Sequence, residues 1–151
     1  VVGHDKFKNN VSESDAKAII EVRVPAQVDD AAGKTEASTV LEKSDTVAIY
    51  GSNEFAAKAI INANGSFKES KLGADKILAV GFDSGALQQD AIRNGLFVGS
   101  VTQDPIQIGY QSVKLAIEAA QGKEVKDVDT GSKWYDAKNI DSDEIKPLLY
   151  Q

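Results

Sequence analysis

Three polar side chains with directional hydrogen-bonding groups follow short apolar runs of the sequence. Asp83 comes directly after KILAVGF (76–82), Asn53 lies just beyond TVAIYG (46–51), and Gln103 comes directly after LFVGSVT (96–102). A carboxylate and two amides present donors and acceptors in fixed directions, which suits a polyhydroxylated ligand. These residues therefore indicate a binding site for a polar small molecule.

The residues needed for common catalytic and metal sites are sparse. His4 is the single histidine and there are no cysteines, so a Ser-His-Asp triad or a histidine metal cluster would have to be built around that one residue. The sequence has neither G-x-G-x-x-G nor a phosphate-binding loop, and Ser84 in GFDSG is out of register for a nucleophile elbow. We therefore predict no enzyme activity, no cofactor and no metal site.

The elements that must position these residues alternate between strand and helix. Apolar runs predict strands over 18–24, 46–51, 76–82 and 96–102, and periodic patterns predict helices over 29–43, 53–65, 86–95 and 104–122. Alternating elements with nearly continuous apolar strands predict an α/β fold, a Rossmann-like parallel sheet with helices on both faces. Ligands of such sheets bind beyond the carboxyl ends of the strands, which is where the three polar residues would lie.

Local signals mark several element ends. Asp104 is a natural N-cap and Pro105 fits the first helical position, while Asn94-Gly95 is a left-handed helix end. We expect the segment 125–135 to form a last strand or an extended crossing. The tail is expected to form a short helical turn from Asp141 that is broken at Pro147.

Each candidate residue also has a purely structural interpretation. Asp83 or Ser84 could cap the helix that follows, and for Asn53 capping is the favoured role. Gln103 could be an exposed loop residue. Trp134 and the tyrosine after it are expected to pack in the core. The residue types alone do not decide between these interpretations.

The charge and composition of the chain limit the kinds of partner and environment that it fits. The chain has 151 residues, a net charge of -6 and a pI of about 4.8, and this acidic balance argues against nucleic acid as a partner. No stretch is long and apolar enough to span a membrane. The lack of cysteine is compatible with an extracytoplasmic protein.

Two long segments resemble the ribose/galactose type of sugar-binding proteins of ABC transporters, which are type I periplasmic binding proteins. The segments are AIYGSNEFAAKAI (48–60) and ILAVGFDSGALQQDAIRNGLFVGSVTQDPIQIGYQSVKLAIEAAQGKEV (77–125). WYDAKNIDSDEIKPLLY (134–150) is similar to the tail of lipoprotein members of that family. The resemblance implies a protein that binds a monosaccharide between two lobes and delivers it to a membrane permease. It also implies an extracytoplasmic location, in the periplasm or as a lipoprotein anchored at the cell surface.

The resemblance also implies a division of the chain. Residues 1–103 would be the C-terminal ligand-binding lobe, incomplete at its start, and 104–126 a hinge-crossing helix that normally belongs to the other lobe. Residues 127–151 would be a return strand and tail, and the N-terminal lobe would be missing. The apolar face of the crossing helix would then lack its usual partner, so we expect the helix to pack back on this lobe, to swap into a neighbouring chain or to be exposed.

Binding roles follow from the resemblance residue by residue. Asn53 matches an asparagine that hydrogen-bonds sugar hydroxyls, and Asp83 matches an aspartate that accepts from two hydroxyls. Gln103 matches a glutamine at the hinge, and Asp29 lies near an acidic position on the cleft rim. The chain departs from the pattern at Glu54, where the family usually has aspartate.

A second function shares this fold and much of the V-G-F-D signature. It is the effector-sensing domain of a lac-repressor-type transcriptional regulator. Regulators of that kind often carry two aspartates after Gly-Phe, whereas this sequence has Asp83 and Ser84. That difference and the lipoprotein-like tail favour transport.

Overall fold

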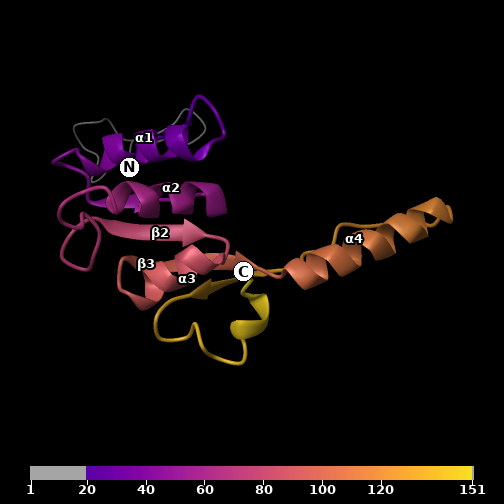
Figure 1. Ribbon diagram of the computed structural model, residues 1–151. Coiled ribbons are helices and arrows are strands. Elements are labelled where there is room, and N and C mark those ends of the chain that lie inside the picture. The colour runs from indigo at the N-terminus through magenta and orange to yellow at the C-terminus, as the bar shows by residue number, and fades with distance from the viewer. Residues whose placement is uncertain (1–19, 151) are drawn as a thin grey trace, which may run out of the picture.

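A computed structural model describes residues 20–150, in which helices alternate with the strands of a single sheet (Figure 1). The elements in chain order are α1 (Asp30–Leu41), β1 (Ala48–Tyr50), α2 (Glu54–Asn64), β2 (Leu78–Phe82), α3 (Ala86–Arg93), β3 (Phe97–Gln103), α4 (Pro105–Ala120), β4 (Ser132–Tyr135) and the 3-10 helix η2 (Lys146–Leu148). The predicted strands 46–51, 76–82 and 96–102 and all four predicted helices are confirmed, with ends that differ by a few residues. None of the described helices is both long and apolar enough to cross a membrane.

The sheet has the strand order β1-β2-β3-β4. The first three strands are parallel, and β4 is antiparallel to β3, with Trp134 opposite Val101. Each parallel strand is therefore followed along the chain by its spatial neighbour, through one helix. The predicted α/β fold with a parallel sheet is confirmed, and the segment 125–135 contributes a strand to it.

The core lies between this sheet and the helices α2 and α3. Ala57 and Ile60 of α2, Ala79 of β2, and Ile92 of α3 belong to one buried cluster. Right-handed crossovers that all step in the same direction place their helices on the same face of a sheet. In the described part of the chain, α2 and α3 therefore lie on the same face of the sheet.

The opposite face of the sheet carries side chains that remain partly exposed in the described part of the chain. Tyr50 is 57% exposed, Leu78 40% and Trp134 42%. Tyr50 of β1 lies opposite Val80 of β2 in the register, and Leu78 comes two residues before Val80 on β2. The side chains of Tyr50 and Leu78 therefore lie on the same face of the sheet. Helix α1 does not cover this face, because it packs against α2.

Several predicted helix ends are confirmed. Asp104 caps α4, where its Oδ1 accepts a hydrogen bond of 2.9 Å from the Gln107 backbone N–H, and Pro105 occupies the first turn. Gly95 and Gly122 adopt φ of 71° and 74°, the left-handed conformation that ends a helix without a Cβ clash.

The predicted strand at 18–24 is wrong over its described residues, 20–24, whereas residues 18 and 19 lie outside the described part. This segment makes no backbone hydrogen bond to any described strand. Ion pairs from Glu21 to Lys43 and from Arg23 to Glu36, the latter 3.7 Å long, hold it beside α1 instead. An extended segment needs a paired neighbour to satisfy its backbone groups, and residues 20–150 offer none to this segment.

Helix α4 projects away from the sheet, and the chain then runs back along it toward β4 (Figure 1). None of its residues is buried, and Ile106, Val113 and Ile117 are 67%, 62% and 53% exposed. Of the three arrangements expected for this helix, packing back on the lobe is wrong, because no residue of α4 is buried. The turn near the C-terminus includes Pro147, so the expected break there is wrong, because proline is tolerated in a first turn, where its missing N–H is not needed.

Candidate functional site

Three of the four candidate residues lie at the carboxyl ends of adjacent parallel strands. Asn53 follows β1, Asp83 follows β2 directly, and Gln103 is the last residue of β3. Because Phe82 lies opposite Val101 in the register, Asp83 and Gln103 extend from neighbouring strands at nearly the same level. The sequence-based placement of these residues at one edge of the sheet is confirmed.

Asp83 links the end of β2 to the start of α2. Its carboxylate Oδ2 accepts a hydrogen bond of 3.0 Å from the backbone N–H of Glu54, and its own N–H donates to the carbonyl oxygen of Val101 at 2.7 Å. The interpretation in which Asp83 or Ser84 caps the helix that follows is wrong, since Gly85 precedes α3 and makes no side-chain cap bond. Asp83 therefore uses one carboxylate oxygen within the fold, and no described group bonds to the other.

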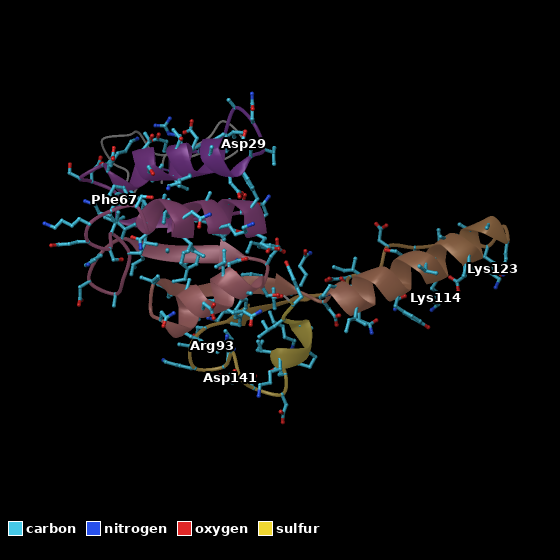
Figure 2. All side chains as sticks on the ribbon, in the orientation of Figure 1. Asp29, Phe67, Arg93, Lys114, Lys123 and Asp141 are labelled. Atoms are coloured by element: carbon cyan, nitrogen blue, oxygen red, sulfur yellow. The ribbon has the colours of Figure 1, made fainter. Side chains whose placement is uncertain are left out.

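Asn53 and Asp29 both cap helices. The Asn53 Oδ1 accepts from the Ala56 N–H at 2.9 Å, and the Asp29 Oδ1 accepts from the Ala32 N–H at 2.8 Å. Both side chains are exposed. Asp29 lies at the N-terminal end of α1. This end is on the same side of the molecule as the carboxyl end of β2 (Figures 1 and 2). In the described chain no hydrogen bond joins Asp29 to Asn53, Asp83 or Gln103.

Gln103 ends β3 opposite Ser132 of β4, and its side chain is exposed. Within residues 20–150 its amide group makes no hydrogen bond. The Asn53 Nδ2, one Asp83 oxygen and the Gln103 amide are thus the polar groups that the three strand ends leave available to a ligand. Among the described residues no three His, Cys, Asp or Glu side chains gather as a metal site would require.

Sequence reasoning missed a contact between the C-terminal tail and this edge. Buried Ser84 donates a hydrogen bond of 3.0 Å from its Oγ to the Leu148 carbonyl oxygen. The Tyr150 hydroxyl donates to the Glu54 carboxylate at 3.3 Å. These partners are more than sixty residues apart in sequence, so no local pattern could have indicated them.

The sequence predicts only part of the environment of Tyr135. Its ring is fully buried, which confirms the expected packing, whereas Trp134 is 42% exposed. The Tyr135 hydroxyl donates a hydrogen bond of 2.8 Å to the backbone carbonyl oxygen of Asp83. Burial raises the pKa of Tyr135 to about 12, so the hydroxyl keeps its proton at neutral pH and remains a donor.

Comparison with known proteins identifies the family. The family model for the periplasmic binding protein domain matches residues 5–124, and the chain belongs to this family. None of the curated proteins matches the chain.

Solved structures of larger proteins share the fold. One, described as an ABC transporter, LacI family transcriptional regulator from Brachyspira murdochii, is 40% identical with a TM-score of 0.77, over 89% of this chain and 44% of that one. An ABC transporter solute binding protein from Agrobacterium vitis with bound D-fucose is 26% identical with a TM-score of 0.76, over 91% and 47%. A carbohydrate transporter solute binding protein from Agrobacterium radiobacter in complex with D-arabinose is 26% identical with a TM-score of 0.66, over 78% and 40%. The chain thus spans less than half the length of these proteins.

Proposed function

We propose that the chain is the C-terminal part of the substrate-binding component of an ABC sugar transporter. In this proposal residues 1–103 form one ligand-binding lobe, 104–126 cross at the hinge, and 127–151 return to the lobe. An N-terminal lobe would complete the cleft. The periplasmic binding protein family and the monosaccharides bound in two of the similar structures support the proposal.

The arrangement of Asn53, Asp83 and Gln103 carries the proposal. Each lies at the carboxyl end of a different parallel strand and has a polar group that no described residue occupies. A charged carboxylate makes stronger hydrogen bonds to hydroxyls than a neutral group does, so Asp83 is proposed as the main anchor for two sugar hydroxyls. Asn53 and Gln103 would bind further hydroxyls, and Asp29 would contribute from the rim.

The proposed mechanism is binding without chemistry. Closure of two lobes around the sugar would bury most of its surface and give the form that a membrane permease recognises. This mechanism requires an extracytoplasmic location, in the periplasm or at the outer surface of the membrane. No catalytic step and no cofactor is part of the proposal.

Calorimetry on the natural protein with both lobes tests the proposal. A panel of pentoses and hexoses is titrated into the parent, the Asp83→Asn variant and an Asp90→Asn control, whose carboxylate lies exposed on α3. Asparagine keeps an acceptor for the Glu54 N–H but lacks the charge. Losing charged hydrogen bonds worth about 1.5–3 kcal/mol should weaken binding roughly 10- to 100-fold.

Two results would contradict the proposal. One is that no sugar of the panel binds to the parent. The other is that Asp83→Asn binds as tightly as Asp90→Asn, which would leave Asp83 with only its structural bond to the Glu54 N–H.

The effector-sensing domain of a transcriptional regulator is the second candidate. The regulator description of the Brachyspira structure favours it, whereas the net charge of -6 gives this part of the chain no attraction for nucleic acid. Sugar-dependent binding of the natural protein to operator DNA would support the regulator and contradict the transporter.

A further inference from the structure

Asp83 has an unusual backbone conformation for its residue type. Its φ is 76°, and it is the one non-glycine residue with a positive φ in the part of the chain that the structure describes. Residues other than glycine adopt a positive φ at an energetic cost, although aspartate tolerates it better than most. A conformation of this kind persists only where the surrounding structure holds it in place.

Three buried side chains from three different elements hold the Asp83 carbonyl oxygen. It accepts hydrogen bonds from Tyr135 Oη of β4 at 2.8 Å, from Ser100 Oγ of β3 at 2.9 Å and from Gln88 Nε2 of α3 at 3.3 Å. Each of the three donor residues is 0% exposed. The three donors therefore hold this carbonyl oxygen inside the core, away from solvent.

The carboxylate of Asp83 depends on the same backbone. Its Oδ2 receives the Glu54 N–H at 3.0 Å, while the peptide on its N-terminal side is fixed by the bond to Val101. With the N-terminal peptide held, relaxation of φ would swing the carbonyl group and Cβ of Asp83 together about the N–Cα bond. Such a change would take the carbonyl oxygen away from its three donors and turn the carboxylate away from the start of α2. The direction of the second carboxylate oxygen would change with it.

We propose that Tyr135 is a positioning residue for sugar binding: its hydroxyl, together with Ser100 and Gln88, holds Asp83 in the left-handed conformation that aims its carboxylate at the ligand. The expected effect of Tyr135 on sugar affinity rests on the proposed function, whereas its expected effect on the conformation of Asp83 does not. Because Tyr135 belongs to β4, the segment that returns after α4 takes part in building the site.

The alternative is that Tyr135 serves only to fill the core. Tyr135→Phe separates the two roles, since it keeps the ring and removes only the hydroxyl. Ser100 and Gln88 would still satisfy the Asp83 carbonyl oxygen, so the variant is expected to fold. Ser100→Ala is a second variant that removes a donor from the same oxygen by a different change to the core.

Two measurements on the natural full-length protein test the proposal. The first is the NMR signal of the Glu54 amide proton without sugar, whose chemical shift and slow exchange report the bond to the Asp83 carboxylate. The second is sugar affinity by calorimetry. Tyr110→Phe is the matched control, because Tyr110 lies on α4 and is not among the groups that bond to Asp83.

For Tyr135→Phe and Ser100→Ala we expect the Glu54 amide proton to shift upfield and exchange faster, and sugar to bind about 5- to 30-fold more weakly. Tyr110→Phe should match the parent in both measurements. A change in core packing alone would lower the melting temperature without moving the Glu54 signal. The proposal is overturned if either the Glu54 signal or the sugar affinity of Tyr135→Phe stays at the parent value, whatever Ser100→Ala does.

The two proposals can fail separately. If the parent binds no sugar, the transport function fails, while the Glu54 amide still decides whether Tyr135 positions Asp83. If sugar binds and the Glu54 signal moves but affinity does not, Tyr135 holds Asp83 in place without serving binding, and the positioning role for sugar is overturned.

Discussion

Raising the pH above 10 should destabilise the protein through Tyr135. The side chain is 0% exposed, and burial raises its pKa from the ordinary value of 10.0 to about 12. Between these two values the unfolded chain has lost the Tyr135 proton and the folded chain still holds it. Since the unfolded state then binds fewer protons, the free energy of unfolding falls as pH rises. The contribution is fully present below pH 10 and is lost as pH rises through about 12.

The size of the effect follows from the shift. A difference of two pKa units corresponds to about 2.7 kcal/mol when the loss is complete, and about half of that, roughly 1.3 kcal/mol, is lost at pH 11. Urea unfolding between pH 9 and 11.5 measures it, with the fluorescence of Trp134, the only tryptophan, as the signal. Tyr135→Phe has no such group, so its stability should fall less steeply over this range.

The difference between the parent and Tyr135→Phe isolates this residue from the other groups that titrate in alkali. Burial also raises the pKa of Tyr150, but Tyr150 is present in both proteins and cancels. Tyr110→Phe removes an exposed tyrosine and should keep the slope of the parent. Equal slopes for the parent and Tyr135→Phe would refute the reasoning, because they would mean that burial does not hold the proton on Tyr135.

Two further predictions concern packing and capping. Gly99→Ala should lower the melting temperature by several degrees, because the new Cβ would lie 2.3 Å from Cζ2 of Trp134 and overpacking costs about 1–3 kcal/mol. A control Ala substitution at Gly109, where the new Cβ meets nothing within 4 Å, should not lower the melting temperature. Asp29→Ala should cost about 1 kcal/mol in urea unfolding through the lost N-cap bond, whereas Asp29→Ser, which keeps a capping oxygen, should not.

The strands and helices around the site could be predicted because their signals are local. Apolar runs of strand length, the Asp104-Pro105 start of α4 and the glycine that ends α3 each act within a few residues of themselves. A parallel sheet then follows from the alternation of elements, and the shared edge follows from the parallel sheet. The placement of Asn53, Asp83 and Gln103 therefore needed no knowledge of tertiary contacts.

Most of the features that sequence reasoning missed depend on partners distant in the chain. The segment 20–24 has the composition of a strand, but pairing needs a neighbour that the described chain does not offer. Asp83 has the residue type of a cap for the helix that follows, yet its positive φ turns the carboxylate back to α2. That φ is held by Tyr135, which is 52 residues away along the chain, so no window of sequence contains the cause.

The same contacts show that the last part of the chain packs with the sheet, unlike helix α4. Tyr135 bonds to Asp83, and the Leu148 carbonyl oxygen accepts from Ser84 and from Thr102, at 3.0 and 3.3 Å. Without the return strand and tail, the buried hydroxyls of Ser84 and Thr102 would lose an acceptor, which is costly in a core. Helix α4, in contrast, has no buried residue. The chain therefore leaves the sheet after Gln103, and the strand and tail that follow α4 complete the support beneath Asp83.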